Sequence, residues 1–537
     1  MLFPDLTNPP PSLEQYFTDQ MPFGPINAAP IEDQAIAAFL LNPHTPFFSA
    51  MVKGQSVVVG RRGAGKSAIV NALRDPLLLA KYLNSFEKKT RDSVMADVMN
   101  IGDDRTLVVD IPADYEMTEV NSILRKKGLN VPVELRADIW LGRIWLHAIV
   151  QLGRKPQFLK KLSPASRERI ELATRSLDPF QRSTVSANDC RKFLKSNADP
   201  WSFIQRLRSE FREKKLRVVF LIDSIDEYRI RESSVSDVLG GLLTLIANIQ
   251  VPTTPEIIKA ALPAETYRAL SGSTNPAKIQ PYIEHIEWKP IELMKIATHR
   301  LLLALYYEDA GKYQNLVGET SVEHRSSREF IRRIWSTIVG ADIEHECRER
   351  ESVIAYVLRH TQLNPRHMLA FLTNCGTLAL RENGSVTFIT PDLIAKNIQP
   401  LCKLIIDEVI YGHKNVYPDF GEVLRLFMPR CKSRMSYGEL QSVYGKSSIK
   451  KTFPHHYTDN FSQFLKALLE AGVFGTFEQE TDRYLEGRFD YNAPGTLRYN
   501  EHSTFLAHPA FAKEFFDGSN GSYQQKPVLP SGSVEGV

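Results

Sequence analysis

Residues 56–67 read SVVVGRRGAGKS, a short β-branched run that ends in Gly60, four further residues and then Gly65-Lys66-Ser67. The run predicts a strand, and the apolar pattern AIVNALR that follows predicts a helix. Glycines in the turn let successive backbone N–H groups point at one anion, and the positive end of the helix adds to that attraction. The spacing predicts a loop that binds the phosphates of a nucleoside triphosphate.

Each position of this loop has an expected role. We expect Lys66 to reach the β- and γ-phosphates and the hydroxyl of Ser67 to bind Mg²⁺. We expect the side chains of Arg61 and Arg62 to face solvent or a partner. ATP and Mg²⁺ are the expected cofactors, and GTP stays open as an alternative to ATP. The candidate nucleotide-binding residues are Gly60, Arg61, Arg62, Gly63, Ala64, Gly65, Lys66, Ser67 and Ala68.

A second segment, residues 217–227, reads RVVFLIDSIDE and supports this interpretation. Its unbroken apolar run predicts a strand covered on both faces, as in a parallel sheet, and ligands bind at the C-terminal ends of such strands. We expect Asp223 to hold Mg²⁺ beside Ser67. Asp226 or Glu227 is expected to orient the attacking water as general base, although a solvated pair at a helix start is the alternative.

The composition is that of an ordinary globular protein. The 537 residues are 43% hydrophobic and 24% charged, which suits two to four domains. The 66 basic and 62 acidic residues give a net charge of +4, too small to indicate nucleic acid by itself. Five scattered cysteines form no Cys-x2-Cys pair, and no 18-residue apolar run is present. We therefore expect a cytoplasmic protein that does not bind a membrane.

Three further segments extend the predicted sheet, and they are TLVVDIP (106–112), EIIKAAL (256–262) and YIEHIEWK (282–289). This gives about five strands interleaved with helices. A helical insertion at about 113–215 separates the two motifs. We expect Trp140 and Trp145 in its core, because together with Ile139, Ile144 and Ala148 they follow helical spacing. From about residue 290 the chain reads as helical.

The C-terminal third reads as a winged helix. Two helices precede a third from Thr458 to Ala471, capped by Thr458 or Asp459, and VFGTF (473–477) and TLRYN (496–500) are expected to form the wing. The outer face of the third helix carries a weak basic set, so we favour packing or oligomerisation over DNA binding. A separate basic cluster could still meet phosphates, and it comprises Arg430, Lys432, Arg434, Lys446, Lys450 and Lys451.

The pattern VVFLIDSIDE resembles the STAND class of P-loop ATPases, including the NACHT-type groups. The run EIIKAALPAETYRAL, followed by YIEHIEWKPIELMKIATHRL, resembles bacterial STAND-like, ORC-like ATPases, and the resemblance covers about 50–400. It implies that Asn364-Pro365-Arg366 is a lid motif in which Arg366 touches the γ-phosphate; an exposed arginine at a helix start is the alternative. A trans-acting arginine finger could come from Arg229, Arg268 or Arg300.

The expected fold class is α/β, a P-loop NTPase sheet followed by a helical lid and a C-terminal winged helix. The expected divisions are an extended arm (1–30), the ATPase domain (31–290), the lid (291–405), the winged-helix-like domain (406–516) and a disordered tail (517–537). The resemblance implies a regulatory switch ATPase in bacterial defence or signalling, in which ATP holds the lid and winged helix against the core. Self-association or a separate effector protein is the expected partner. A DNA-associated initiator and a scaffold without turnover are the alternatives.

One segment departs from the pattern of the resembled family. Where such ATPases carry a polar sensor at the end of the fourth strand, this chain has Leu262-Pro263-Ala264-Glu265. The departure implies that hydrolysis is slow or conditional.

Overall fold

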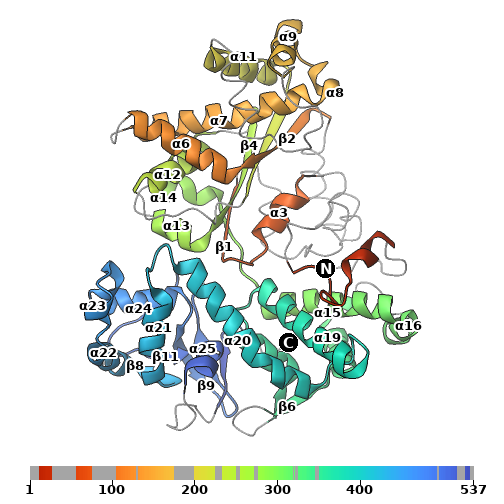
Figure 1. Ribbon diagram of the computed structural model, residues 1–537, viewed down its shortest axis with the longest axis vertical. Coiled ribbons are helices and arrows are strands. Elements are labelled where there is room, and N and C mark those ends of the chain that lie inside the picture. Colours follow the sequence, from red (N-terminus) through yellow and green to blue (C-terminus); the bar gives the residue numbers. More distant parts are fainter. Residues whose placement is uncertain are drawn as a thin grey trace.

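The structure is a computed structural model that describes residues 11–26, 56–74, 104–127, 131–174, 199–223, 233–249, 254–270, 276–318, 320, 324–344, 350–492, 495–516 and 526–532. Figure 1 shows an α/β domain in the upper half of the molecule. The lower half holds a helical region (290–413) and a C-terminal region (420–530).

A five-stranded parallel sheet forms the centre of the α/β domain. Its order is β2 (Thr106–Pro112), β3 (Arg217–Asp223), β4 (Glu256–Pro263), β1 (Ser56–Gly60) and β5 (Ile283–His285). The prediction of about five strands flanked by helices is confirmed. The expected strand at 282–289 is shorter, because Pro290 already begins a helix. Since β4 separates β1 from β3, its C-terminal end lies between Gly60 and Asp223.

Helices cover both faces of this sheet (Figure 1). Val57 and Val59 of β1 belong to one apolar cluster with the helices of the insertion, whereas Val58 belongs to the cluster that contains α3. The alternation follows from the two-residue period of a strand. The covering helices are α3 (Lys66–Ala72), α6 (Ala113–Lys127), α7 (Val133–Gly153), α12 (Ser233–Asn248), α13 (Ala264–Leu270) and α14 (Pro276–Ile279).

The helical insertion is built around α7. Trp140 and Trp145 have no exposed surface, as predicted, and their indole N–H groups donate to Val238 O at 2.7 Å and to Glu256 Oε1 at 2.9 Å. A buried indole needs such a partner for its N–H. The outer end of the insertion is formed by α8 (Pro156–Leu159), α9 (Pro164–Thr174) and α11 (Pro200–Glu213).

The helical region follows β5 directly. Its helices are α15 (Pro290–Glu308), α16 (Ala310–Val317), α17 (Arg328–Ile338), α18 (Val353–His360), α19 (Pro365–Asn383) and α20 (Pro391–His413), with a small hairpin of β6 (Asp342–Glu344) and β7 (Arg350–Ser352). Asn364 caps α19 and Thr390 caps α20, and each accepts a hydrogen bond from a backbone N–H of the first turn. The apolar cluster that contains α3 continues through this region into the C-terminal region.

The C-terminal region combines short helices with a second five-stranded sheet. The strand order is β12 (Val528–Pro530), β10 (Leu485–Arg488), β9 (Phe474–Glu480), β11 (Thr504–Ala507) and β8 (Arg434–Ser436). The helices are α21 (Phe420–Phe427), α22 (Tyr437–Lys446), α23 (Ile449–Thr452), α24 (Phe461–Glu470) and α25 (Pro509–Phe515).

Three sequence expectations for this region are wrong. Residues 496–500 form no strand, and the strand lies at β11, where Thr504, Phe505 and Leu506 pair with β8. The helix α24 begins later than expected and is capped by Asn460 instead of Thr458 or Asp459. The tail is not entirely disordered, because β12 adds to β10 in parallel register.

The N-terminal segment 11–26 is also not simply extended. It contains a 3₁₀ helix, η1 (Pro11–Tyr16), and then packs Phe23 onto α19, where a Cβ atom on Gly376 would come within 2.4 Å of the Phe23 ring. Arg300 of α15 has no exposed surface and donates to Phe23 O at 2.9 Å and to Pro25 O at 3.1 Å. These contacts fix the segment to the helical region.

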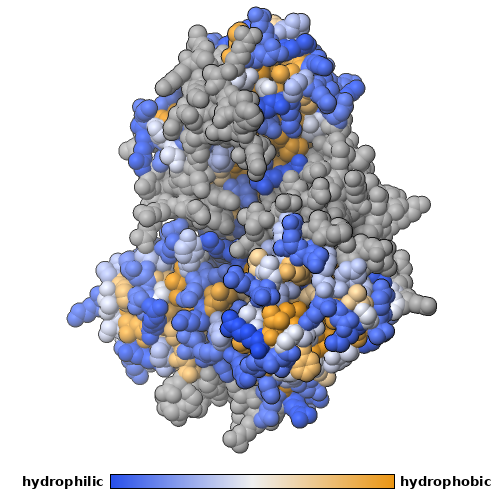
Figure 2. All heavy atoms as spheres, turned by 45° about the vertical axis from the view of Figure 1, so that its right-hand side comes forward, coloured by the Kyte–Doolittle hydropathy of each residue, from blue (hydrophilic) through white to orange (hydrophobic). Residues whose placement is uncertain are grey.

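The face drawn in Figure 2 is mainly hydrophilic in its described part, with apolar side chains grouped at the upper end and across the lower half. Among the described residues, the helices include none whose length and apolar character would suit a membrane span.

Replacement of Phe23 by alanine is expected to lower the thermal stability of the protein. The ring is 1% exposed, and removal of such a ring costs about 3 kcal/mol or more. Differential scanning calorimetry measures the loss. The control is Phe388→Ala, whose ring is 58% exposed and should change the midpoint little. Equal midpoints for the two variants would contradict the docking of the N-terminal segment.

Candidate functional site

The glycine-rich loop lies between β1 and α3, as the sequence predicted. Gly63 and Gly65 adopt φ values of +82° and +94°, in the left-handed region that side chains other than glycine rarely enter. Gly60 allows close packing instead, because a Cβ atom there would lie 3.3 Å from both Ala64 Cβ and Ile286 Cβ. The loop therefore has the curvature with which successive N–H groups bind an anion at the start of α3.

Lys66 and Ser67 lie at the first turn of α3. Lys66 is 5% exposed, and its Nζ donates to Gly60 O and Arg61 O, each at 3.0 Å. The Ser67 hydroxyl donates to Asp223 Oδ1 at 3.2 Å, so the two expected magnesium ligands meet across β4. A hydroxyl and a carboxylate at this separation are oxygen donors that suit one divalent cation.

The remaining predicted site residues differ in where they lie. Ala64 is buried within the loop, and Ala68 is buried in the first turn of α3. Asp226 and Glu227 lie outside the described residues, as does Arg229, so the expected general base is not located. Arg300 is wrong as an arginine finger, because its guanidinium is buried against the N-terminal segment.

Arg61 does not face solvent, contrary to expectation, whereas Arg62 is half-buried. Arg61 Nη1 donates to Gln362 Oε1 at 2.8 Å, and Nη2 donates to Glu470 O at 2.7 Å. The guanidinium of Arg62 lies over the ring of Tyr411, 4.4 Å from its centroid. Both arginines are therefore used to hold other parts of the chain against the loop.

Backbone carbonyls of the loop also accept hydrogen bonds from side chains of the helical region and of the segment that precedes it. Trp288 Nε1 donates to Ala64 O at 2.9 Å, and Asn364 Nδ2 donates to Arg62 O at 2.6 Å. The other amide atom of Asn364, Oδ1, accepts from Arg366 N and so caps α19. Leu363, the residue before it, has a φ of +45°, a strained value that neighbouring contacts must maintain. The start of α19 is thus fixed to the loop.

Arg366 follows this cap and lies close to the loop backbone. A Cβ atom on Gly63 would come within 2.8 Å of Arg366 Cβ. The Arg366 side chain is 26% exposed, and its Nη1 lies 3.6 Å from Oε1 of Glu408 in α20. Burial alone would raise the pKa of Glu408, but the hydrogen bond from His367 and the charge of Arg366 outweigh it and lower that pKa. Arg366 therefore lies next to the loop, and its guanidinium pairs with Glu408.

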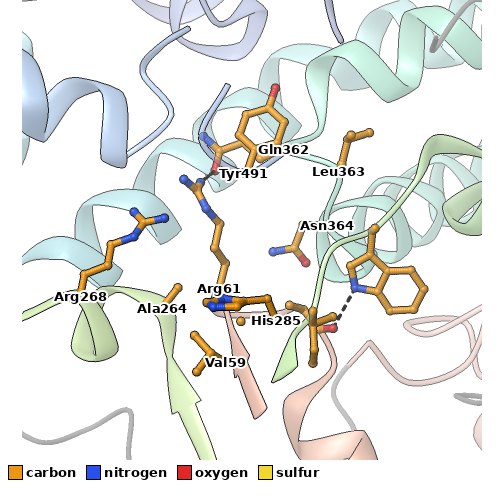
Figure 3. A pocket seen from close by; sticks show the side chains of 13 residues that line it. Val59, Arg61, Ala264, Arg268, His285, Gln362, Leu363, Asn364 and Tyr491 are labelled. Atoms are coloured by element: carbon orange, nitrogen blue, oxygen red, sulfur yellow. Dashed lines mark hydrogen bonds between the residues drawn. The ribbon is translucent and has the colours of Figure 1, made fainter. Parts of the chain in front are cut away.

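Figure 3 shows the space beside the loop, with Arg61 pointing toward Gln362 and Tyr491 and with Arg268 next to it. His285 enters this space from β5, and Trp288, three residues further along the chain, also lines it. Sequence reasoning did not identify Trp288, Gln362 or Tyr491 as loop contacts. The sequence signal for Trp288 was its place in the run YIEHIEWKPIELMKIATHRL, which carries the resemblance, whereas Gln362 and Tyr491 belong to no motif.

Replacement of Gly63 by alanine is expected to destabilise the site directly. The left-handed φ costs a side chain about 1–2 kcal/mol, and the added Cβ atom would also press on Arg366 and Asn364. Thermal unfolding measures the loss. The matched control is Gly438→Ala in α22, where an added Cβ atom meets nothing within 4 Å and should be neutral or stabilising. A neutral Gly63→Ala would contradict the close approach of α19.

Comparison with known proteins agrees with this geometry. A family model described as the KAP family P-loop domain matches residues 35–379. A search of curated proteins gives no match. The family match includes the glycine loop, the Ser67–Asp223 pair and the start of α19. It covers well over half of the 537 residues, and the chain belongs to the KAP family of P-loop NTPases.

Proposed function

We propose that this protein is a regulatory switch ATPase that binds ATP with Mg²⁺ and hydrolyses it slowly or under control. The observation that carries the proposal is the contact of Ser67 with Asp223 at 3.2 Å, beside a loop with the positive φ values of a phosphate cradle. ATP would supply the phosphoanhydride bond whose cleavage is the reaction.

The residues of the loop have separate tasks in this proposal. Its N–H groups bind the β- and γ-phosphates, and Lys66 turns from the carbonyls of Gly60 and Arg61 to the same oxygens. Ser67 and Asp223 hold Mg²⁺. Glu227 or Asp226 accepts a proton from the attacking water, as the sequence predicted.

The switch part of the proposal rests on how much of the chain touches the loop. We interpret 290–413 as the lid, because Asn364 at the start of α19 donates to a loop carbonyl. Arg366 would then leave Glu408 and contact the γ-phosphate. Bacterial defence or signalling, with self-assembly or a separate effector, remains the setting suggested by the STAND-like resemblance.

We interpret the C-terminal region as a winged helix. The chain runs α21, β8, α22, α23, α24, β9, β10, β11, in which α23 is a single short turn before α24, and β11 pairs with both β8 and β9 in antiparallel register. The strand β10 pairs with β9 and lengthens the wing. This order supports the domain interpretation.

DNA binding is the second candidate, and the structure offers it little support. Six residues of α24 are buried, so most of the third helix is not available to a groove. The wing strand β9 ends in Glu478 and Glu480, and Glu480 already pairs with Arg434 at 3.0 Å. A carboxylate-bearing wing is poorly suited to phosphates. We therefore keep packing as the role of this domain.

Replacement of Lys66 by alanine is expected to abolish ATP binding with little change in fold. Isothermal titration calorimetry with a non-hydrolysable ATP analogue and Mg²⁺ measures the affinity, and phosphate release measures turnover. In the same assays Glu227→Gln should bind ATP but turn over ~100-fold more slowly. Unchanged affinity in Lys66→Ala would falsify the loop assignment. Normal turnover in Glu227→Gln with loss in Asp226→Asn would exchange the two acids.

Replacement of Arg366 by alanine is expected to reduce the extra thermal stabilisation that an ATP analogue gives over ADP. The reason is that only the γ-phosphate contact is lost, and a ligand stabilises the state it binds. The control is Arg425→Ala, whose exposed side chain pairs with Glu422 on α21. Equal differences between the two nucleotides in wild type and Arg366→Ala would leave Arg366 without a sensor role.

A further inference from the structure

The C-terminal region meets the phosphate loop through a buried carboxylate. Asp490 is 3% exposed and lies between two arginines of the P-loop domain. Its Oδ2 pairs with Arg61 Nη2 at 3.5 Å and accepts a short hydrogen bond from Arg268 Nη2. One arginine belongs to the loop itself and the other to α13, which follows β4.

Further hydrogen bonds around Asp490 hold this contact in place. Its Oδ1 accepts from Gly495 N at 3.0 Å, which fixes the carboxylate in its turn. Arg61 and Arg268 also donate to Glu470 O at the end of α24. The next residue but one, Gly472, has a φ of +68°, and a Cβ atom there would lie 3.0 Å from Gln362 Nε2.

The three parts of the chain therefore converge at one point. Gln362 Nε2 of the helical region donates to Ala471 O and Gly472 O at 3.2 and 3.3 Å, and its Oε1 accepts from Arg61. The ring of Tyr491 lies 5.4 Å from the guanidinium carbon of Arg61. The Asp490 side chain is only 4% exposed, so removal of its arginine partners would leave a buried and uncompensated carboxylate.

We propose that Asp490 is a latch that holds the C-terminal region on the phosphate loop, and that bound triphosphate weakens it. The nucleotide part rests on the proposed function. Arg61 connects the two sites, since its side chain holds Asp490 while its carbonyl accepts from Lys66. When Lys66 turns to phosphate, that carbonyl loses a donor, and the negative charge of the nucleotide repels the nearby carboxylate. ATP, with one more phosphate than ADP, opens the latch further.

The coupling must be reciprocal, because it is a free energy shared by two binding events. Triphosphate that weakens the latch is itself bound more weakly while the latch is closed. Asp490→Asn keeps the shape of the side chain and an acceptor for Gly495 N but removes the charge. Asp482→Asn is the matched control, an exposed acid at the turn between β9 and β10.

The test uses the full chain and two measurements. Without nucleotide, hydrogen–deuterium exchange should be faster in Asp490→Asn than in wild type at peptides covering 470–476 and 359–364. With Mg²⁺, titration should show about tenfold tighter binding of a fluorescent non-hydrolysable ATP analogue, a common size of coupling, and a smaller gain for the ADP analogue. Asp482→Asn should match wild type in both.

Unchanged exchange together with unchanged or weaker triphosphate binding in Asp490→Asn would overturn the latch. If Asp490→Asn does not fold, Arg268→Gln provides the same exchange comparison, because it removes the closer partner of Asp490; wild-type exchange in that variant would also overturn it. Absence of any nucleotide binding in wild type would instead refute the proposed function and the nucleotide dependence, and the exchange comparison alone would then decide the latch.

Discussion

The curvature of the phosphate loop imposes the constraint on which the rest of the structure depends. A loop whose N–H groups converge on one anion turns its carbonyl groups outward, and buried carbonyls need donors. Lys66 serves the carbonyls of Gly60 and Arg61, Asn364 serves that of Arg62, and Trp288 serves that of Ala64. The helical region therefore supplies, through Asn364, one of the donors that these loop carbonyls require.

Buried charges in this protein play two different parts. In the insertion, Glu116 accepts two hydrogen bonds from Arg143, at 2.7 and 3.0 Å, and lies 2.8 Å from His147 Nε2. Burial alone would raise the pKa of Glu116, but its contacts with His147 and Arg143 outweigh it and lower that pKa. This group lies within one domain and fixes α6 on α7. The Asp490 group joins separate regions, so its energy depends on how those regions are placed.

The pKa values of Arg61 and Arg268, the two arginines that pair with Asp490, reflect how these regions are placed. Burial is the largest influence on both and would lower each pKa, whereas Asp490 opposes it. The balance differs, because the pKa of Arg61 is lowered while that of Arg268 is raised. Arg61 is the more deeply buried of the two, and Arg268 has the closer contact with Asp490, including a hydrogen bond. Arg61 is thus a cation held in the loop at some cost, and it depends on the C-terminal region for compensation.

The sequence predicted those features whose chemistry is local. Gly60, Lys66, Ser67 and Asp223 could be found because a phosphate cradle and a strand end each require particular residues at fixed spacing. The partners of Arg61 could not, since Glu470 is 409 positions away and no motif marks it. The error at 496–500 has a similar origin, because the choice of β11 is decided by pairing with β8 and β9 and not by local propensity.

The helical region and the C-terminal region are expected to respond differently to an anion in the loop, because they bring side chains of opposite charge to it. The helical region brings a cation, Arg366, which now pairs with Glu408 and would gain by turning toward phosphate. The C-terminal region brings an anion, Asp490, which phosphate repels. If the proposed latch holds, the expectation that ATP holds both regions against the core would apply to the helical region alone. In this proposal one bound ligand draws the lid inward and loosens the C-terminal region, so the two movements are coupled in opposite directions through the same loop.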